Sequence, residues 1–288
     1  MTDTGATQSQ QASPVAQSGR VFADILCAVD GTHRSYEAVE QAAALAGPHG
    51  RLSLLAVTAV GGEGQYRHAA ISPERAERVL EHAARIAEQA HVPCTSTIDP
   101  GSPPPQVILQ QAVQHDLLAL GAPTGSVLGG MLIDGVTHSA LSSSPVPLLA
   151  ARELPKGADR FAARIVVASD GLDGSDELVA LVGRLAREHA AAVTLLHAVG
   201  VESRARPHRI SEQARSLDAT LQGTSDVRVE AGDAPSAILQ AAQDTAASLI
   251  VMGSRGLTGL KVIGSVSRHM LHEAHCSVLL MPPERLRA

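Results

Sequence analysis

The chain has 288 residues, of which 44% are hydrophobic and 18% charged, and its formal net charge is −6. This length indicates two domains, each long enough to bury a core. With two Phe, two Tyr and no Trp, the chain lacks the rings of a stacking platform for single-stranded nucleic acid, and its acidic balance argues against a duplex-binding surface. No apolar run approaches the roughly 20 residues of a membrane span. We therefore expect neither a nucleic-acid nor a membrane partner.

The N-terminal residues 1–20 are polar and lack the apolar core of a signal peptide, so we expect a disordered tail. The three cysteines, Cys27, Cys94 and Cys276, are odd in number and have no CxxC spacing. The simplest interpretation is a reduced, cytoplasmic location.

The rest of the chain alternates short β-branched runs with longer segments rich in Ala, Leu, Glu and Arg. In the first half we expect strands at 23–29, 52–59, 93–98, 117–121 and 146–150, and helices at 34–46, 73–90, 104–115 and 133–143. In the second half we expect strands at 164–169, 192–199, 226–230, 248–252 and 277–281, and helices at 174–190, 208–222, 234–245 and 265–273. This alternation, with nearly continuous apolar strands, is typical of a doubly wound parallel α/β fold in each half.

The two halves also repeat each other in sequence. ILCAVDG at 25–31 matches IVVASDG at 165–171, and LLALG at 117–121 matches LIVMG at 249–253. A constant order with drifting offsets indicates a duplicated whole domain with loop insertions. We expect domains at 21–151 and 164–288, joined by a linker at 152–163.

Candidate binding residues follow the first and fourth strands, because ligands of open parallel sheets bind where the strand order reverses. In the second half, Asp170 follows the first strand, and a glycine-rich segment runs from Gly253 to Ser267. Glycines let backbone N–H groups approach an anion, and a helix beginning near Ser265 would favour phosphate. Asp170 would accept a hydrogen bond from a ribose hydroxyl or an adenine amine, or hold a divalent metal. The alternative is that Ser265 only caps a helix and the glycines only shape loops.

On these residues both halves resemble the universal stress protein domain, over about residues 21–283. The marks are the VDG-type end of the first strand, the LIVMG fourth strand and a motif related to G-x2-G-x9-G-[S/T]. The resemblance implies two tandem doubly wound, Rossmann-like domains, each with a five-stranded parallel sheet. It also implies binding of ATP, or of ADP or AMP, with Mg²⁺ in many members. By resemblance, the ATP contacts are Asp170, Ala198, Met252, Gly253, Gly256, Gly264, Ser265, Val266 and Ser267.

The sequence departs from the family motif in both halves. Gly256 and Gly264 enclose seven residues rather than nine, which shortens the phosphate loop. The first half retains Asp30 and Gly121 and offers Val57 as an aliphatic wall, but Asp134–Gly135 stand where the family has Gly–Ser. A carboxylate there would repel a triphosphate by about 1 kcal/mol or more. We therefore rank the second half as the better nucleotide site.

Several other signals carry no assignment. The spacing of His269, His272, His275 and Cys276 fits the last helix and the start of the last strand, so we assign no metal there. His197 ends an apolar strand and is interpreted as a buried structural histidine rather than a base. No nucleophile elbow or paired acid and base is present, so we expect at most slow ATP hydrolysis. A stress-response sensor or regulator that binds an adenine nucleotide is favoured; the alternative is a nucleotide-independent interaction protein whose glycine loops are structural remnants.

The fifth strands of the two halves, beginning near Val146 and Ser277, would each leave an apolar edge exposed if their domain stood alone. Pairing them within one chain would create a pseudo-twofold unit, as the resemblance also implies. Whether two chains then form a homodimer stays open.

Overall fold

The computed structural model describes residues 19–58, 71–100, 103–122, 144–172, 174–199, 207–223, 225–254 and 264–282. Its first half contains β1 (Asp24–Ala28), α1 (His33–Ala46), β2 (Arg51–Val57), α2 (Pro73–Gln89), β3 (Cys94–Asp99), α3 (Pro104–Ala112), β4 (Leu117–Gly121) and β5 (Leu148–Ala151). Its second half contains β6 (Arg164–Ala168), α5 (Ser175–His189), β7 (Ala192–Val199), α6 (Pro207–Leu221), β8 (Ser225–Ala231), α7 (Ala234–Asp244), β9 (Leu249–Gly253), α8 (Ser265–Glu273) and β10 (Ser277–Met281).

The predicted α/β architecture is confirmed. Every predicted strand, and every predicted helix in the described ranges, is present, with its ends within three residues of the expected positions. The largest difference is at α3, which ends at Ala112 rather than 115, because the chain turns there to bring Asp116 to the start of β4. The predicted helix at 133–143 lies outside the described residues.

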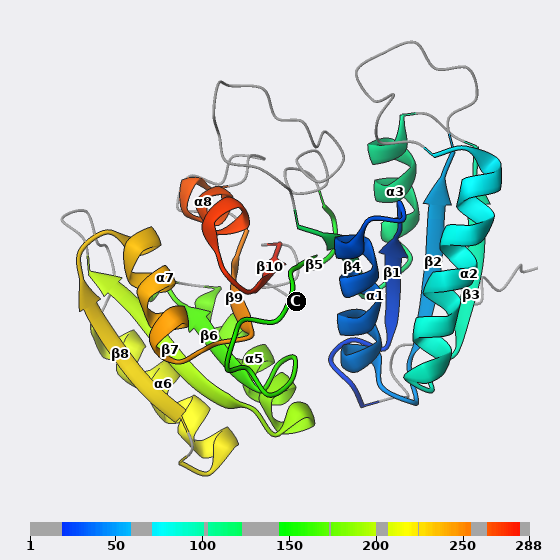
Figure 1. The fold of residues 1–288 in the computed structure, drawn as a ribbon. Helices are drawn as coiled ribbons and strands as arrows, with labels where there is room; N and C mark the ends of the chain where they lie inside the picture. The colour runs from blue at the N-terminus through cyan, green and yellow to red at the C-terminus, as the bar shows by residue number, and fades with distance from the viewer. Residues whose placement is uncertain are drawn as a thin grey trace, which may run out of the picture.

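The ten strands in the described ranges form a single sheet of order β3-β2-β1-β4-β5-β10-β9-β6-β7-β8. Within each half the neighbouring strands are parallel, while β5 and β10 are antiparallel, with Leu149 opposite Leu279. Figure 1 shows the two halves on either side of this β5–β10 pairing, which we call the seam. The expected pairing of the fifth strands thus occurs within the chain.

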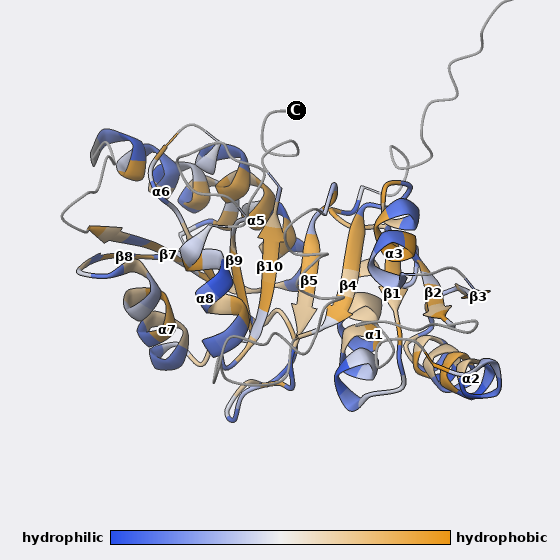
Figure 2. Ribbon diagram, turned by 90° about the horizontal axis from the view of Figure 1, so that it is seen from above, coloured by the Kyte–Doolittle hydropathy of each residue, from blue (hydrophilic) through white to orange (hydrophobic). Residues whose placement is uncertain are grey.

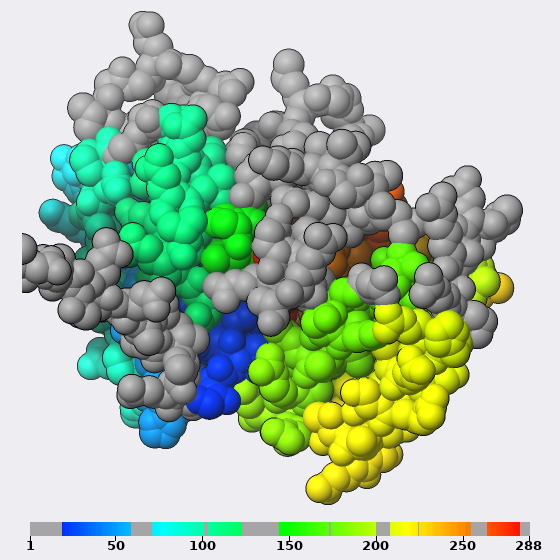
Figure 3. Space-filling model, turned by 180° about the vertical axis from the view of Figure 1, so that it is seen from behind, coloured from blue at the N-terminus to red at the C-terminus, as the bar shows by residue number. Residues whose placement is uncertain are grey.

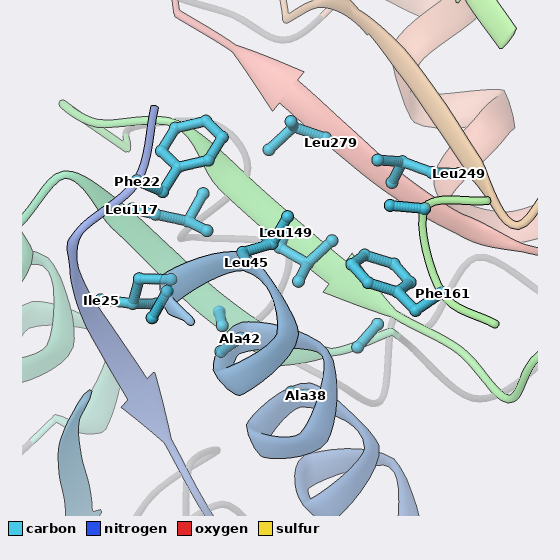
Figure 4. Close-up of a cluster of buried hydrophobic side chains, with 14 of the residues drawn as sticks. Phe22, Ile25, Ala38, Ala42, Leu45, Leu117, Leu149, Phe161, Leu249 and Leu279 are labelled. Atoms are coloured by element: carbon cyan, nitrogen blue, oxygen red, sulfur yellow. The ribbon is translucent and has the colours of Figure 1, made fainter. Parts of the chain in front are cut away.

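Helices cover both faces of the sheet because the strands are apolar on both faces. Figure 2 shows the hydrophobic strands between helices whose hydrophilic sides turn outward. One buried cluster lies under α1, α2, α5 and α6, and a second lies under α3, α7 and α8. In the first cluster Leu45 of α1 belongs with Leu149, Leu279 and Leu249, so the core runs across the seam (Figure 4).

Polar side chains also join the halves at the seam. Gln41 of α1 donates from Nε2 to the carbonyl of Arg152 at 2.6 Å, and the Ser277 hydroxyl of β10 donates to Gln41 Oε1 at 2.7 Å. The same hydroxyl accepts a hydrogen bond from the backbone N–H of Arg152 at 2.9 Å. The side chain of Arg152 donates to the carbonyls of Leu271 and His272 at the end of α8. The last helix is therefore tied to the chain segment that leaves β5.

The start of the described chain crosses to the second half. The backbone N–H of Val21 donates to Glu188 Oε1 at 2.8 Å, and Figure 3 shows this N-terminal segment in dark blue against the yellow-green second half. Burial, together with the positive charges of the nearby Arg20 and Arg160, lowers the pKa of the neighbouring His189 to about 4. His189 is therefore neutral in the native state over most of the pH range in which an exposed histidine titrates.

This burial predicts a specific acid sensitivity. As the pH falls from about 6.5 to about 4, the unfolded chain takes up a proton on His189 that the native state excludes. The free energy of unfolding should therefore fall, by up to about 2 kcal/mol after solvent screening is allowed for. Urea unfolding at pH 7 and pH 4.5 measures the decline. His189→Gln should reduce it and the matched control His275→Gln, at an exposed position, should not; equal declines in both variants would contradict the assignment.

Candidate functional site

The strand order reverses once in each half, between β1 and β4 and between β6 and β9. In the second half, Ala168 of β6 pairs with Met252 of β9. Asp170 and Gly253 therefore lie beyond, or at, the carboxyl ends of two adjacent parallel strands. An open α/β sheet forms its ligand crevice at this point.

The end of β9 and the start of α8 are fastened together. The Ser267 hydroxyl donates to the carbonyl of Gly253 at 2.9 Å, and the N–H of Gly264 donates to the carbonyl of Ser254 at 3.0 Å. Ser254 in turn donates its N–H to the carbonyl of Met281 in β10, at 2.9 Å. The glycine-rich end of the fourth strand and the helix start are thus adjacent, as the sequence predicts.

The first turn of α8 presents its backbone N–H groups at this junction. Gly264 is the N-cap in an extended conformation, and as a glycine it makes no side-chain hydrogen bond to the first turn. The first N–H groups of a helix have no partner within the helix, and they carry the positive end of its dipole. The first turn consists of Ser265, Val266 and Ser267; these residues supply donors suited to an anion.

Asp170 is exposed but held in place. Its Oδ1 accepts hydrogen bonds from the N–H of Leu172 at 3.0 Å and from the Ser175 hydroxyl at 2.5 Å. Within the described part of the chain, both donors go to Oδ1, which leaves Oδ2 for a ligand. Sequence reasoning did not identify Ser175 as its partner, although serine at the start of a predicted helix is a typical capping residue.

The aliphatic candidates lie near the carboxyl ends of two strands on either side of β6, namely β9 and β7. Met252 is buried in β9, and Ala198 is half-buried near the end of β7, whose neighbour in the sheet is β6. Without an aromatic ring among these residues, a base bound here would contact aliphatic walls and backbone. Gly256 lies outside the described residues.

The first half keeps part of the same frame. Asp30 is exposed and accepts hydrogen bonds from the N–H and hydroxyl of Thr32, at 2.9 and 2.7 Å. Gly121 ends β4 where a Cβ atom would lie 2.9 Å from Cβ of Arg34, so a side chain is excluded there. Val57 is the buried last residue of β2. Asp134 and Gly135, which replace the Gly–Ser of the family motif, lie outside the described residues.

The described ranges also bear on three other features: a metal site, a reactive thiol and a membrane-spanning helix. These ranges hold no cluster of three or more His, Cys, Asp or Glu side chains suited to a metal ion. Burial raises the pKa of the Cys276 thiol to about 12, which keeps it protonated and unreactive. None of the helices placed there combines the length and apolarity that crossing a bilayer requires.

Comparison with known proteins agrees with the duplicated architecture. A model of the Universal stress protein family matches residues 22–152 and again residues 162–282. The chain belongs to the universal stress protein family. A curated universal stress protein of Thermus aquaticus, encoded in the QAH/OAS sulfhydrylase 3′ region, is 33% identical over 132 residues, which cover 41% of this chain and 96% of that protein.

Solved structures of this family and related proteins share the two-domain fold. A universal stress protein from Archaeoglobus fulgidus has a TM-score of 0.74 at 19% identity and covers 92% of this chain and 97% of its own. A functionally unknown protein from Pseudomonas aeruginosa PAO1 has a TM-score of 0.64 at 19% identity, covering 92% and 94%. At these identities the likeness shows the fold alone, so the function must be argued from the site.

The junction between β9 and α8 makes a direct stability prediction. Ser267→Ala removes the buried hydrogen bond to the Gly253 carbonyl, so the free energy of unfolding should fall by about 1–2 kcal/mol. Ser265→Ala, two positions earlier in the same turn but exposed, should change it by less than about 0.5 kcal/mol. Chemical denaturation of both variants measures the difference, and equal effects would contradict the junction as described.

Proposed function

We propose that this universal stress protein binds ATP, or a closely related adenine nucleotide, with Mg²⁺ in its second half and acts as a sensor or regulator in a stress response. The observation that carries the proposal is the N-terminus of α8, where the N-cap is a glycine and which is fastened by Ser267 and Gly264 to the end of β9. Backbone donors and a positive dipole then converge where the strand order reverses.

The remaining residues fit the other parts of a nucleotide. The phosphates would accept hydrogen bonds from the N–H groups of the first turn of α8. The exposed carboxylate of Asp170 cannot assist an anion, and it suits a ribose hydroxyl, an adenine amine or the magnesium ion. Ala198 and Met252 supply aliphatic contacts to the base. Affinity would depend mainly on backbone donors, because ring stacking is missing from this set.

The second half alone is proposed to hold the nucleotide. The first half offers Asp30, Val57 and Gly121, but its sequence has Asp134 where the second half has Gly264. A carboxylate near a phosphate-receiving helix start opposes a triphosphate. The first half would then serve as the structural partner across the seam.

A regulatory role fits the chemistry of the site better than turnover. Among the described residues at the junction, the groups are backbone N–H donors, serine hydroxyls and one carboxylate, without a paired acid and base. Slow hydrolysis of ATP is the most that such a set would support. A change in occupancy, rather than a product, would carry the signal.

A negative charge introduced at the first turn of α8 tests the proposal without destabilising the helix. In Ser265→Asp the new carboxylate lies at the first helical position, where it favours the dipole and repels phosphate. We expect the Kd for Mg·ATP, measured by calorimetry, to rise at least about tenfold, equivalent to about 1.4 kcal/mol. The thermal midpoint should stay the same or rise.

Ser216→Asp is the matched control, because Ser216 is also exposed but lies within α6. It makes the same change in net charge and should leave the Kd unchanged. Equal affinity in Ser265→Asp and the wild type would exclude the α8 site. If the wild type shows no saturable binding at millimolar ATP, the nucleotide proposal is wrong and a nucleotide-independent interaction protein becomes the better account.

A further inference from the structure

Three buried positions that correspond in the two halves carry side chains of different polarity. The sheet register aligns Leu55 with Leu196, since these residues pair with Ala28 and Ala168. The residues that follow Ala28 and Leu55 in the first half therefore correspond to those that follow Ala168 and Leu196 in the second. Helices α2 and α6 both begin with a proline, and these prolines are taken as equivalent positions. At three such positions the first half has apolar residues, each at most 4% exposed: Val29, Ala56 and Val79. The second half has polar residues there, each at most 6% exposed: Ser169, His197 and Gln213.

His197 holds the backbone just before Asp170. His197 is 2% exposed, and its Nδ1 lies 2.8 Å from the carbonyl oxygen of Ser169. Because a carbonyl can only accept, Nδ1 carries the proton and donates it. The other ring nitrogen, Nε2, is buried and has no hydrogen-bond partner in the described part of the chain.

The Ser169 hydroxyl holds the backbone just after Asp170. It accepts a hydrogen bond from the N–H of Gly171 at 3.1 Å and donates to Gln213 Oε1 at 2.7 Å. Gly171 has a φ of 67°, so the chain turns sharply here. The peptide groups on both sides of Asp170 are therefore fixed by buried side chains.

The same network continues to two helices. Gln213 donates from Nε2 to Asp176 Oδ1 at 2.7 Å, and Arg209 forms an ion pair with Asp176. Gln213 and Arg209 belong to α6, while Asp176 lies in the first turn of α5. The loop that carries Asp170 is thus held from the sheet by His197 and from the helices by Gln213.

A buried polar network is an unfavourable substitute for apolar packing unless its groups are fully hydrogen-bonded. Among the residues that the structure describes, one nitrogen of His197 has no partner. The first half shows that the fold accommodates apolar residues at the same three positions. We propose that His197 is a positioning residue that fixes Asp170 for the nucleotide in the second half, acting through its Nδ1–H and the Ser169 carbonyl. This inference rests on the proposed nucleotide site.

Two near-isosteric variants separate the nitrogens of the ring. In His197→Asn the amide N–H lies near the place of Nδ1 and retains the donor to Ser169, whereas in His197→Gln it lies near Nε2 and that donor is lost. Two quantities are measured for each: hydrogen exchange of the Gly171 and Leu172 amides without ligand, and the Kd for Mg·ATP.

We expect His197→Gln to speed the exchange of both amides about tenfold and to raise the Kd about tenfold. His197→Asn should stay within about threefold of the wild type in both. The triple variant Ser169→Val, His197→Ala, Gln213→Val reproduces the apolar residues of the first half. It should fold at least as stably as the wild type and bind Mg·ATP more weakly, which covers the case in which a single variant fails to fold.

The outcomes distinguish this inference from the proposed function. If the wild type binds Mg·ATP and His197→Gln binds equally well, or if amide exchange in His197→Gln is unchanged, positioning by His197 is wrong. If His197→Gln retains the wild-type exchange and Kd while His197→Asn does not, the role belongs to Nε2, and this result also overturns the inference. Absence of ATP binding by the wild type overturns the proposed function, while the exchange comparison still reports whether His197 fixes the loop.

Discussion

The antiparallel pairing of β5 with β10 is the constraint on which the rest of the arrangement depends. Every residue of these two strands is buried, whereas the outer strands β3 and β8 are mostly exposed. Neither half could leave such an apolar edge in water without a partner. The pairing makes one sheet from two, joins the cores through Leu149 and Leu279, and places Gln41 and Arg152 where they hold β10 and the end of α8.

The helix tied down by Arg152 is also the helix proposed to bind phosphate. Its C-terminal carbonyls contact the segment leaving β5, and its first turn is fastened to Gly253 by Ser267. Both ends of α8 are therefore fixed, one to the seam and the other to the end of β9. A phosphate bound at the first turn, as proposed, would therefore add charge to a helix whose other end contacts the segment leaving β5.

Much of this arrangement could be predicted from the sequence because it rests on local patterns. Apolar runs marked the strands, and capping residues such as Thr32, Ser72 and Asp233 accept hydrogen bonds from the helix starts that follow them. The contacts that distinguish the halves could not be predicted in this way. Ser169 and Gln213, whose side chains share a hydrogen bond, are 44 residues apart. Single polar residues therefore meet through the fold without a periodic signal in either segment.

The two halves have the same order of strands and helices, and the proposed function depends on the residues in which they differ. Asp30 and Asp170 follow equivalent strands, but the buried Ser169 and His197 hold the peptide groups on both sides of Asp170, and the same half has a Gly–Ser start to α8. We therefore propose, above all, that the second half binds the nucleotide and that the first half is its structural partner. Native mass spectrometry of the full chain with excess Mg·ATP measures this directly. The account predicts one nucleotide bound per chain; two per chain would contradict the asymmetry, and none would contradict nucleotide binding itself.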